Sequence, residues 1–212
     1  FVGEICQKYC EGDARIVYKK LDKNEGISGN TNRCYEMATG NYIGLFDHDD
    51  LLHPSVLYEY MKVICEQDAD YIYCDEATFV CEEKDNYKIV FKNHKPEFSP
   101  DTLRSYNYIC HFTCFARGLY EQVGNFNKEY DGSQDYDLIL RLTEKANTIV
   151  RIPKLLYFWR SHALSVASDV SAKPYVVNSA KKALAAHLER VGLKGEVKDA
   201  YAPTTYKINY EI

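Results

Sequence analysis

Asn41-Tyr42-Ile43-Gly44-Leu45-Phe46, followed directly by Asp47-His48-Asp49-Asp50, is the stretch of sequence that decides the fold. Its apolar half is long enough for a strand buried in a sheet, and its acidic half marks where that strand ends. Residues 71–74 repeat this arrangement, because an apolar run there ends in Asp75-Glu76. From Pro54 onward, a helix with apolar residues at three- and four-residue spacing separates the two strands. The alternation predicts an α/β domain with a mixed, mainly parallel sheet flanked by helices, in which ligands bind beyond the carboxyl ends of the strands.

Apolar periodicity and helix-breaking residues place the other elements. Helices are expected over residues 1–11, from Asn30 or Thr31 to Gly40, in a short segment up to Gly124, over 135–145 and over 174–191. Strands are expected over residues 15–18, 109–115 and 153–160, with a surface excursion over the polar residues 82–100. Residues 1–192 are expected to form one domain, with 193–212 as a C-terminal extension or a linker to a further domain.

Bulk composition excludes several classes of protein. The chain has 212 residues, a formal net charge of −5 and no block of lysine and arginine, so nucleic acid is not an expected partner. No apolar run approaches the ~20 residues that span a bilayer, so we expect no transmembrane segment. A cytoplasmic location is expected, with peripheral association at the inner face of the membrane as an alternative.

The eight cysteines form no C-x-x-C pair, so reduced, mostly buried thiols are expected rather than a disulfide framework. Cys110-His111 with Cys114 is the one cluster that suggests zinc. Its spacing matches no zinc finger, and it lies in a strand-like run, so zinc is the disfavoured alternative.

The acidic end of the first strand suggests a cation site. Asp47, Asp49 and Asp50 place three carboxylates close together, where their repulsion is costly unless a cation lies among them. Mg²⁺ or Mn²⁺ is the natural occupant, because both prefer oxygen ligands. The alternative is that one aspartate only caps the following helix, and Asp50 is the expected structural member.

Two later motifs carry candidate chemistry. Gly132-Ser133-Gln134-Asp135-Tyr136-Asp137 places Asp135 where a helix begins, so the helix dipole favours the ionised carboxylate that a general base requires. The alternative is that Asp135 or Asp137 is only an N-terminal cap. Trp159-Arg160-Ser161-His162 ends a strand, where Arg160 suits a phosphate and His162 a metal. Taken alone, His162 is more often an ordinary surface or packed histidine.

The order and spacing of these motifs resemble glycosyltransferase family 2, of the GT-A type, over nearly the whole chain. The matching stretches are Asn24 to Ser28 with Asn32, Ala38 to Asp50, Lys95 to Asp101, Asn107 to Ile109, Gly132 to Leu138 and Tyr157 to His162. They are similar to the subgroup that builds bacterial surface polysaccharides, often containing rhamnose. Gln134 departs from the pattern, because many relatives carry an acidic residue there.

The resemblance implies an inverting, single-displacement transfer of a sugar from a nucleotide-sugar donor to a saccharide or lipid-linked saccharide acceptor. It makes Asp135 the catalytic base and Asp49 the direct ligand of Mn²⁺ or Mg²⁺. His162 is a further metal contact. The implied donor-binding residues are Asn24, Asn32, Asp47, Asp49 and Arg160.

One part of the family pattern has no counterpart before Phe1, namely the opening strand and helix that carry an early aspartate. We therefore expect a GT-A-like sheet without its first strand and with an open edge, through which the chain self-associates. Two other functions remain open from the sequence. The first is a non-catalytic carbohydrate- or nucleotide-binding fragment of a larger synthase, and the weaker second is a metal-dependent hydrolase built on Asp47, Asp49 and Asp75.

Overall fold

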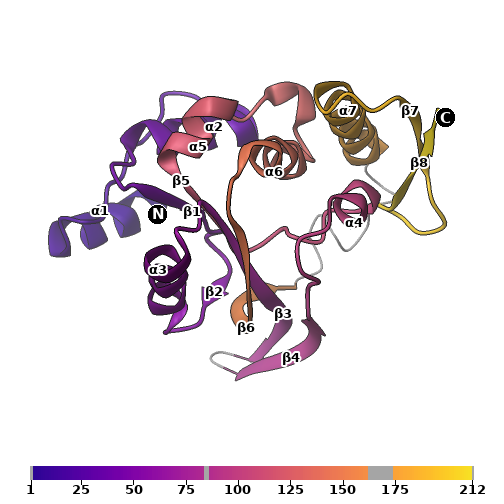
Figure 1. Ribbon diagram of the computed structural model, residues 1–212. Helices are drawn as coiled ribbons and strands as arrows, with labels where there is room; N and C mark the ends of the chain where they lie inside the picture. Colours follow the sequence, from indigo (N-terminus) through magenta and orange to yellow (C-terminus); the bar gives the residue numbers. More distant parts are fainter. Residues whose placement is uncertain (1, 84–85, 162–173, 212) are drawn as a thin grey trace.

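The computed structural model describes residues 2–83, 86–161 and 174–211 (Figure 1). Its helices are α1 Val2–Gly12, α2 Gly26–Met37, α3 Val56–Gln67, α4 Pro100–Ser105, α5 Arg117–Val123, the 3₁₀ helix η1 Lys128–Tyr130, α6 Gln134–Lys145 and α7 Pro174–Arg190. Its strands are β1 Tyr42–Leu45, β2 Leu51–Leu52, β3 Tyr71–Glu83, β4 Asn86–Asn93, β5 Thr113–Ala116, β6 Ile149–Arg160, β7 Gly195–Asp199 and β8 Tyr206–Tyr210. None of the described helices is long and apolar enough to cross a membrane.

The central sheet is mixed, with the strand order β1-β5-β3-β6-β2 and with β4 paired to β3. Strands β3 and β6 are parallel, from Tyr71 opposite Ile149 to Phe79 opposite Arg160. Both β1 and β3 are antiparallel to β5, which lies between them, so β1, β3 and β6 run in one direction. This mixed sheet flanked by helices confirms the expected α/β class, and among the described strands β3 and β6 form the only parallel pair. In the described residues, β1 pairs with β5 and its outer edge carries no strand.

Strand alternation divides the core between the two faces of the sheet. Tyr71 and Tyr73 of β3 pack with α5 and α6 in one apolar cluster, whereas Ile72 and Cys74 of the same strand pack with α3 in the other. Both faces of β3 are therefore covered, which explains why the sequence of this strand is apolar at successive positions (Figure 1).

Local predictions differ from the structure at three places. Residues 15–18 form no strand, because Ile16 and Val17 are exposed and no described strand pairs with them. Helix α2 begins at Gly26, four or five residues before the expected start, and the Asn24 side chain accepts the Gly26 N–H at 2.9 Å. The stretch after residue 82 has exposed side chains along β4, as expected of a surface excursion, but its backbone forms a strand that pairs with β3.

The cysteines also differ from expectation. Only Cys74 and Cys114 are buried, because other cysteines occupy solvent-facing positions of α2, α3 and β3. No disulfide joins any of the eight, all of which lie in the described residues.

The C-terminal residues form the β7–β8 hairpin, which contacts α7 and α4 (Figure 1). Tyr206 of β8 is buried in the same apolar cluster as Tyr71, and Val197 of β7 packs against that cluster. This packing extends the core beyond residue 192. A separate unit from residue 193 onward stays a prediction.

Glu144 joins the last helix to the rest of the domain. Its carboxylate lies 2.6 Å from Nδ1 of the buried His187 and 2.7 Å from Nη2 of Arg190, both on α7. His187 accepts a hydrogen bond from Arg104 of α4 through Nε2, at 3.1 Å. Burial alone would raise the pKa of Glu144, but the hydrogen bonds from His187 and Arg190 lower it below its ordinary value.

Glu144→Gln tests this junction. Because the native pKa of Glu144 is depressed, its charge stabilises the fold above the ordinary value of 4.5, and this stabilisation is lost as the pH falls. We expect urea unfolding to show a loss of roughly 1.5–3 kcal/mol at pH 7, shrinking toward pH 3. Lys181→Ala, which removes an ion pair to the exposed Asp199, is the control and should cost less than about 1 kcal/mol. If Glu144→Gln lowers the free energy of unfolding by the same amount at pH 7 and at pH 3, the assignment is wrong.

Candidate active site

The acidic loop that follows β1 is fastened to β6 by Asp50. The Asp50 carboxylate is 5% exposed, and it accepts hydrogen bonds from the Tyr157 hydroxyl and from the Arg160 N–H, the latter at 2.7 Å. Burial raises the pKa of Asp50, although both hydrogen bonds oppose the shift. Asp50 therefore holds the loop in place rather than facing a ligand, as predicted for the structural member of the motif.

Asp47 and Asp49 lie on the accessible part of the same loop. The Asp47 side chain is 59% exposed, and Asp49 is half-buried. Arg160 donates from Nε to the Asp49 carbonyl oxygen at 2.5 Å, and its guanidinium carbon lies 4.7 Å from the centre of the Phe79 ring. Arg160, predicted from sequence as a phosphate contact, is thus fixed beside the acidic loop by the β3–β4 hairpin.

Asp135 lies in the first turn of α6. The N-cap of this helix is Ser133, so the alternative that Asp135 or Asp137 is the cap is wrong. Asp137 instead pairs with Arg141 at 2.8 Å, one helical turn later, as the i, i+4 spacing predicts. The Asp135 carboxylate accepts a hydrogen bond from Nδ2 of Asn107 at 3.1 Å. Burial raises the pKa of Asp135, while the charge of His111 lowers it.

His111 lies between the acidic loop and Asp135. Its Nε2 is 3.8 Å from Oδ2 of Asp47, and its ring stacks on Tyr157 with 5.1 Å between centres. Burial alone would lower the pKa of His111, but Cys110, Asp47 and Asp135 together raise it above its ordinary value. Sequence reasoning considered His111 only as a zinc ligand. The sequence feature that could have placed His111 in the site is its position just after the Asn107 to Ile109 motif.

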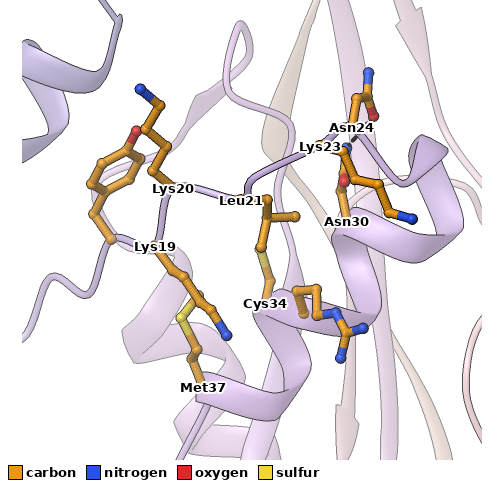
Figure 2. A pocket seen from close by; sticks show the side chains of 10 residues that line it. Lys19, Lys20, Leu21, Lys23, Asn24, Asn30, Cys34 and Met37 are labelled. Carbon is orange, nitrogen blue, oxygen red and sulfur yellow. Dashed lines mark hydrogen bonds between the residues drawn. The ribbon is translucent and has the colours of Figure 1, made fainter.

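Asn24 lines a hollow of about 360 Å³ along one side of α2 (Figure 2). Oδ1 of Asn24 accepts hydrogen bonds from the Gly26 N–H and from Nδ2 of Asn30, each at 2.9 Å. Lys19, Lys20, Lys23 and Arg33 share this lining, and Arg33 pairs with Glu25 at 3.2 Å and with Glu36 at 2.8 Å. The three lysines therefore supply the positive charge of the hollow, on a chain whose net charge is negative.

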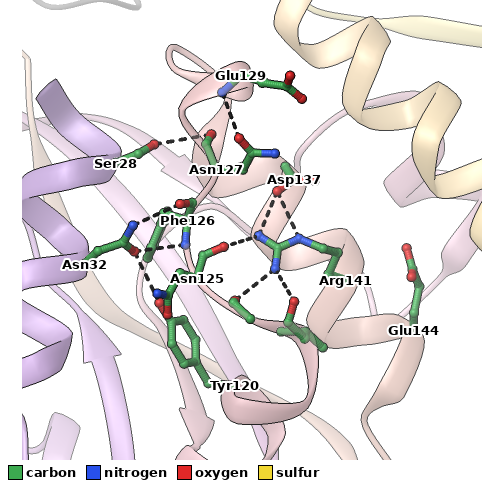
Figure 3. A network of polar contacts seen from close by, with 12 residues as sticks. Ser28, Asn32, Tyr120, Asn125, Phe126, Asn127, Glu129, Asp137, Arg141 and Glu144 are labelled. Carbon is green, nitrogen blue, oxygen red and sulfur yellow. Dashed lines mark hydrogen bonds and ion pairs between the residues drawn. The ribbon is translucent and has the colours of Figure 1, made fainter.

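Both ends of the Asn32 amide bind the backbone of Phe126. Its Nδ2 donates to the Phe126 carbonyl at 3.0 Å and its Oδ1 accepts the Phe126 N–H at 2.9 Å (Figure 3). Arg141 binds the same turn from the other side, donating to the carbonyl of Asn125 at 3.0 Å. This places Asn32 in a network that joins α2 to α6, and its contact to a donor stays a prediction.

Asp75 is a structural residue. It is 1% exposed, pairs with Arg151 at 3.0 Å and with His94 at 2.9 Å, and accepts the Lys95 N–H at 3.1 Å. Strand β3 also continues past it, so Asp75 does not lie at a strand end as expected. With its oxygens bound in this way, Asp75 is unsuited to the hydrolase hypothesis.

Within the described ranges, no group of three histidine, cysteine, aspartate or glutamate side chains is arranged to hold a metal ion. His162 falls outside those ranges, so the structure does not place it. Asp47 and Asp49 nevertheless supply carboxylate oxygens of the kind that Mg²⁺ and Mn²⁺ use together with the phosphates of a substrate.

A family model for glycosyl transferase family 2 matches residues 2–124, which contain the acidic loop, His111 and the cationic hollow. The chain belongs to glycosyl transferase family 2. Protein y4gI of Sinorhizobium fredii is 36% identical over 192 residues, covering 89% of this chain and 21% of the relative. The O-antigen biosynthesis protein RfbC of Myxococcus xanthus is 28% identical over 212 residues, covering all of this chain and 16% of the relative. The chain thus spans about a fifth of the length of these relatives.

Solved glycosyltransferases share the fold of this family 2 domain. TarS of S. aureus in complex with UDP-GlcNAc has a TM-score of 0.67 at 16% identity, covering 88% of this chain and 54% of that one. A mannosyltransferase from Pyrobaculum calidifontis in complex with GDP-Man and Mn²⁺ has a TM-score of 0.53 at 13% identity, covering 90% and 62%. At these identities the likeness shows the GT-A fold alone.

Asp50→Ala tests the fastening of the acidic loop. The substitution leaves the Tyr157 hydroxyl and the Arg160 N–H without their acceptor, which costs about 1–3 kcal/mol for each buried donor. We expect urea unfolding to show a loss of roughly 2–4 kcal/mol for Asp50→Ala. The exposed Asp47→Ala is the control, with a loss below about 1 kcal/mol. Equal losses for the two variants would show that Asp50 does not hold the loop.

Proposed function

We propose that this family 2 domain transfers a sugar from a nucleotide-sugar donor to a saccharide or lipid-linked saccharide acceptor, with inversion, in the synthesis of a cell-surface polysaccharide. The observation that carries the proposal is the meeting of Asp135 and the Asp47–Asp50 loop at His111. A base for the acceptor and a carboxylate site for the donor thereby share one place in the fold. The likeness to RfbC, an O-antigen biosynthesis protein, supports the polysaccharide class.

Recognition of an anionic donor needs local positive charge, because the net charge of −5 repels anions. Arg160 supplies one guanidinium beside Asp49, and the cationic hollow around Asn24 supplies three lysines. The solved neighbour TarS binds UDP-GlcNAc on the same fold. We therefore propose Asn24, Asp47, Asp49 and Arg160 as donor-binding residues. Asn32 is proposed on the family resemblance alone, because both ends of its amide bind Phe126.

A divalent metal fits the carboxylates of the acidic loop. Asp49 and His162 would hold Mn²⁺ or Mg²⁺, and the bound ion would neutralise the charge that grows on the departing diphosphate. Arg160 adds a fixed cation next to this loop, held by the Asp49 carbonyl and by stacking on Phe79. The mannosyltransferase complex with Mn²⁺ supports the choice of metal.

Asp135 serves as the general base in this proposal. It takes the proton of the acceptor hydroxyl as that oxygen attacks the anomeric carbon, and the bond to the diphosphate breaks in the same step. Burial raises the pKa of Asp135, which makes the carboxylate more basic, while the charge of His111 opposes that rise. Fixing both reactants in line supplies much of the remaining acceleration.

The alternative function is a non-catalytic carbohydrate- or nucleotide-binding fragment of a larger synthase. Donor binding without turnover would identify it.

A cytoplasmic location, peripheral at the inner face of the membrane, is proposed because nucleotide sugars are the donors. The outer edge of β1, which carries no strand in the described residues, is the proposed surface for self-association.

Asp49→Ala tests the metal assignment. We expect calorimetric titration with UDP or GDP to show binding that requires Mn²⁺ in the parent and is lost in Asp49→Ala. Asp50→Asn is the control, because it keeps an acceptor oxygen in the loop but changes a carboxylate that faces β6 rather than the ligand. Parent-like, manganese-dependent binding by Asp49→Ala would refute the assignment.

Asp135→Asn tests the base. The substitution keeps the shape of the side chain but removes the lone pair that accepts the proton. We expect turnover to fall by roughly 10²-fold or more, with donor affinity nearly unchanged. The measurement is the rate of nucleoside diphosphate release from a sugar nucleotide that the parent uses, at saturating donor. Unchanged turnover would make Asp135 a structural residue.

A further inference from the structure

We propose that Asn107 is the positioning residue of the base: it fixes the carboxylate of Asp135 and aims one of its oxygens at the acceptor. The inference deepens the proposed function and rests on it. Asn107 lies between α4 and β5, in the segment of residues 107–111 that faces both Asp135 and Asp47.

The amide of Asn107 is held at both ends. Nδ2 donates to Oδ2 of Asp135 at 3.1 Å, and Oδ1 accepts the Cys110 N–H at 3.2 Å. A backbone N–H requires an acceptor and a carboxylate requires a donor, so this amide has only one useful orientation. The Cys110 backbone has a φ of 39°, in the left-handed region that non-glycine residues seldom adopt. The hydrogen bond from its N–H helps to keep that turn in place.

The same segment is anchored at its other end. The main-chain carbonyl of His111 accepts a hydrogen bond from Nζ of Lys95, whose ammonium is buried and pairs with Glu76 at 2.9 Å. The His111 side chain faces Asp47 at 3.8 Å. Residues 107–111 therefore contact the base at one end and the acidic loop at the other. The length of this segment sets the distance between the base and the loop that would hold the donor.

The chemical consequence concerns the two oxygens of Asp135. Asn107 donates to Oδ2, and the backbone N–H groups of Asp135 and Tyr136 also donate to this carboxylate, so these donors together fix the orientation of the group that takes the proton of the acceptor hydroxyl. A hydrogen bond donated to a carboxylate also favours its ionised form, which a base must have. An ordinary fold-stabilising asparagine would affect unfolding but neither the titration of Asp135 nor the rate at saturating donor.

Titratable groups around Asp135 set its ionisation together with Asn107. They are His111 and Cys110 of the same segment, Asp47 of the acidic loop, Tyr71 of β3 and Tyr136 of α6.

The test measures the pKa of Asp135 directly, by ¹³C NMR titration of aspartate-labelled chain without any ligand, with Asp135→Asn identifying the signal. Asn107→Ala removes the donor, and we expect the pKa to rise by about 1. Asn107→Asp keeps the shape and the acceptor for Cys110 but places a like charge beside Asp135, so a larger rise is expected even if Asn107→Ala unfolds. Asn209→Ala, at an exposed position of β8, is the matched control and should leave the pKa unchanged.

Kinetics provide the second readout. With a sugar nucleotide that the parent uses, Asn107→Ala should lower kcat by roughly 10- to 100-fold and leave the donor KM unchanged. An unchanged pKa of Asp135 in both variants, or a loss confined to KM, would overturn the positioning role. Failure of the proposed function is distinguishable, because a parent that binds neither UDP nor GDP with Mn²⁺ refutes it, while the NMR titration still decides the contact of Asn107 with Asp135.

Discussion

The buried carboxylate of Asp50 is the contact on which the arrangement of the site depends. It follows β1 in the chain but accepts its hydrogen bonds from Tyr157 and Arg160 at the end of β6. The acidic loop that leaves β1 is thereby joined at its last residue to β6, which is not a neighbour of β1 in the sheet. Burying a carboxylate is costly unless such donors surround it. The two hydrogen bonds offset this cost, and the same contact fixes Asp47 and Asp49 next to Arg160.

Opposite charges then organise the rest of the site. Asp47 in the loop after β1 and Asp135 in the first turn of α6 both act on His111, and the two carboxylates alone would repel each other. The charge of His111, 3.8 Å from Asp47, reduces that repulsion in a partly buried place. A donor site and a base on either side of one segment suit a single-displacement transfer, because both reactants must be held in line.

Local patterns in the sequence predicted those parts of the fold in which the apolar repeat coincides with a buried face of the helix or strand. Strand β1, helix α6 and the Asp137–Arg141 pair are examples, and Asp50 was expected to be structural. Residues 15–18 have an apolar pattern without a paired neighbour, so the prediction of a strand there failed. In β4, Tyr87, Ile89 and Phe91 alternate with lysine and valine, but their side chains are exposed, so the polar composition around them hid the strand. Asn107 and His111 acquire their contacts only when the turn before β5 approaches α6 and the acidic loop. No local periodicity encodes that approach.

A crystal structure with Mn²⁺ and an unreactive sugar-nucleotide analogue tests the central claim most directly, because anomalous scattering locates manganese without assumptions about the ligand. The account predicts a manganese peak within coordination distance of an Asp49 oxygen, with the anomeric carbon of the analogue facing the Asp135 carboxylate. Manganese bound away from the acidic loop, or a sugar that points away from Asp135, would contradict it.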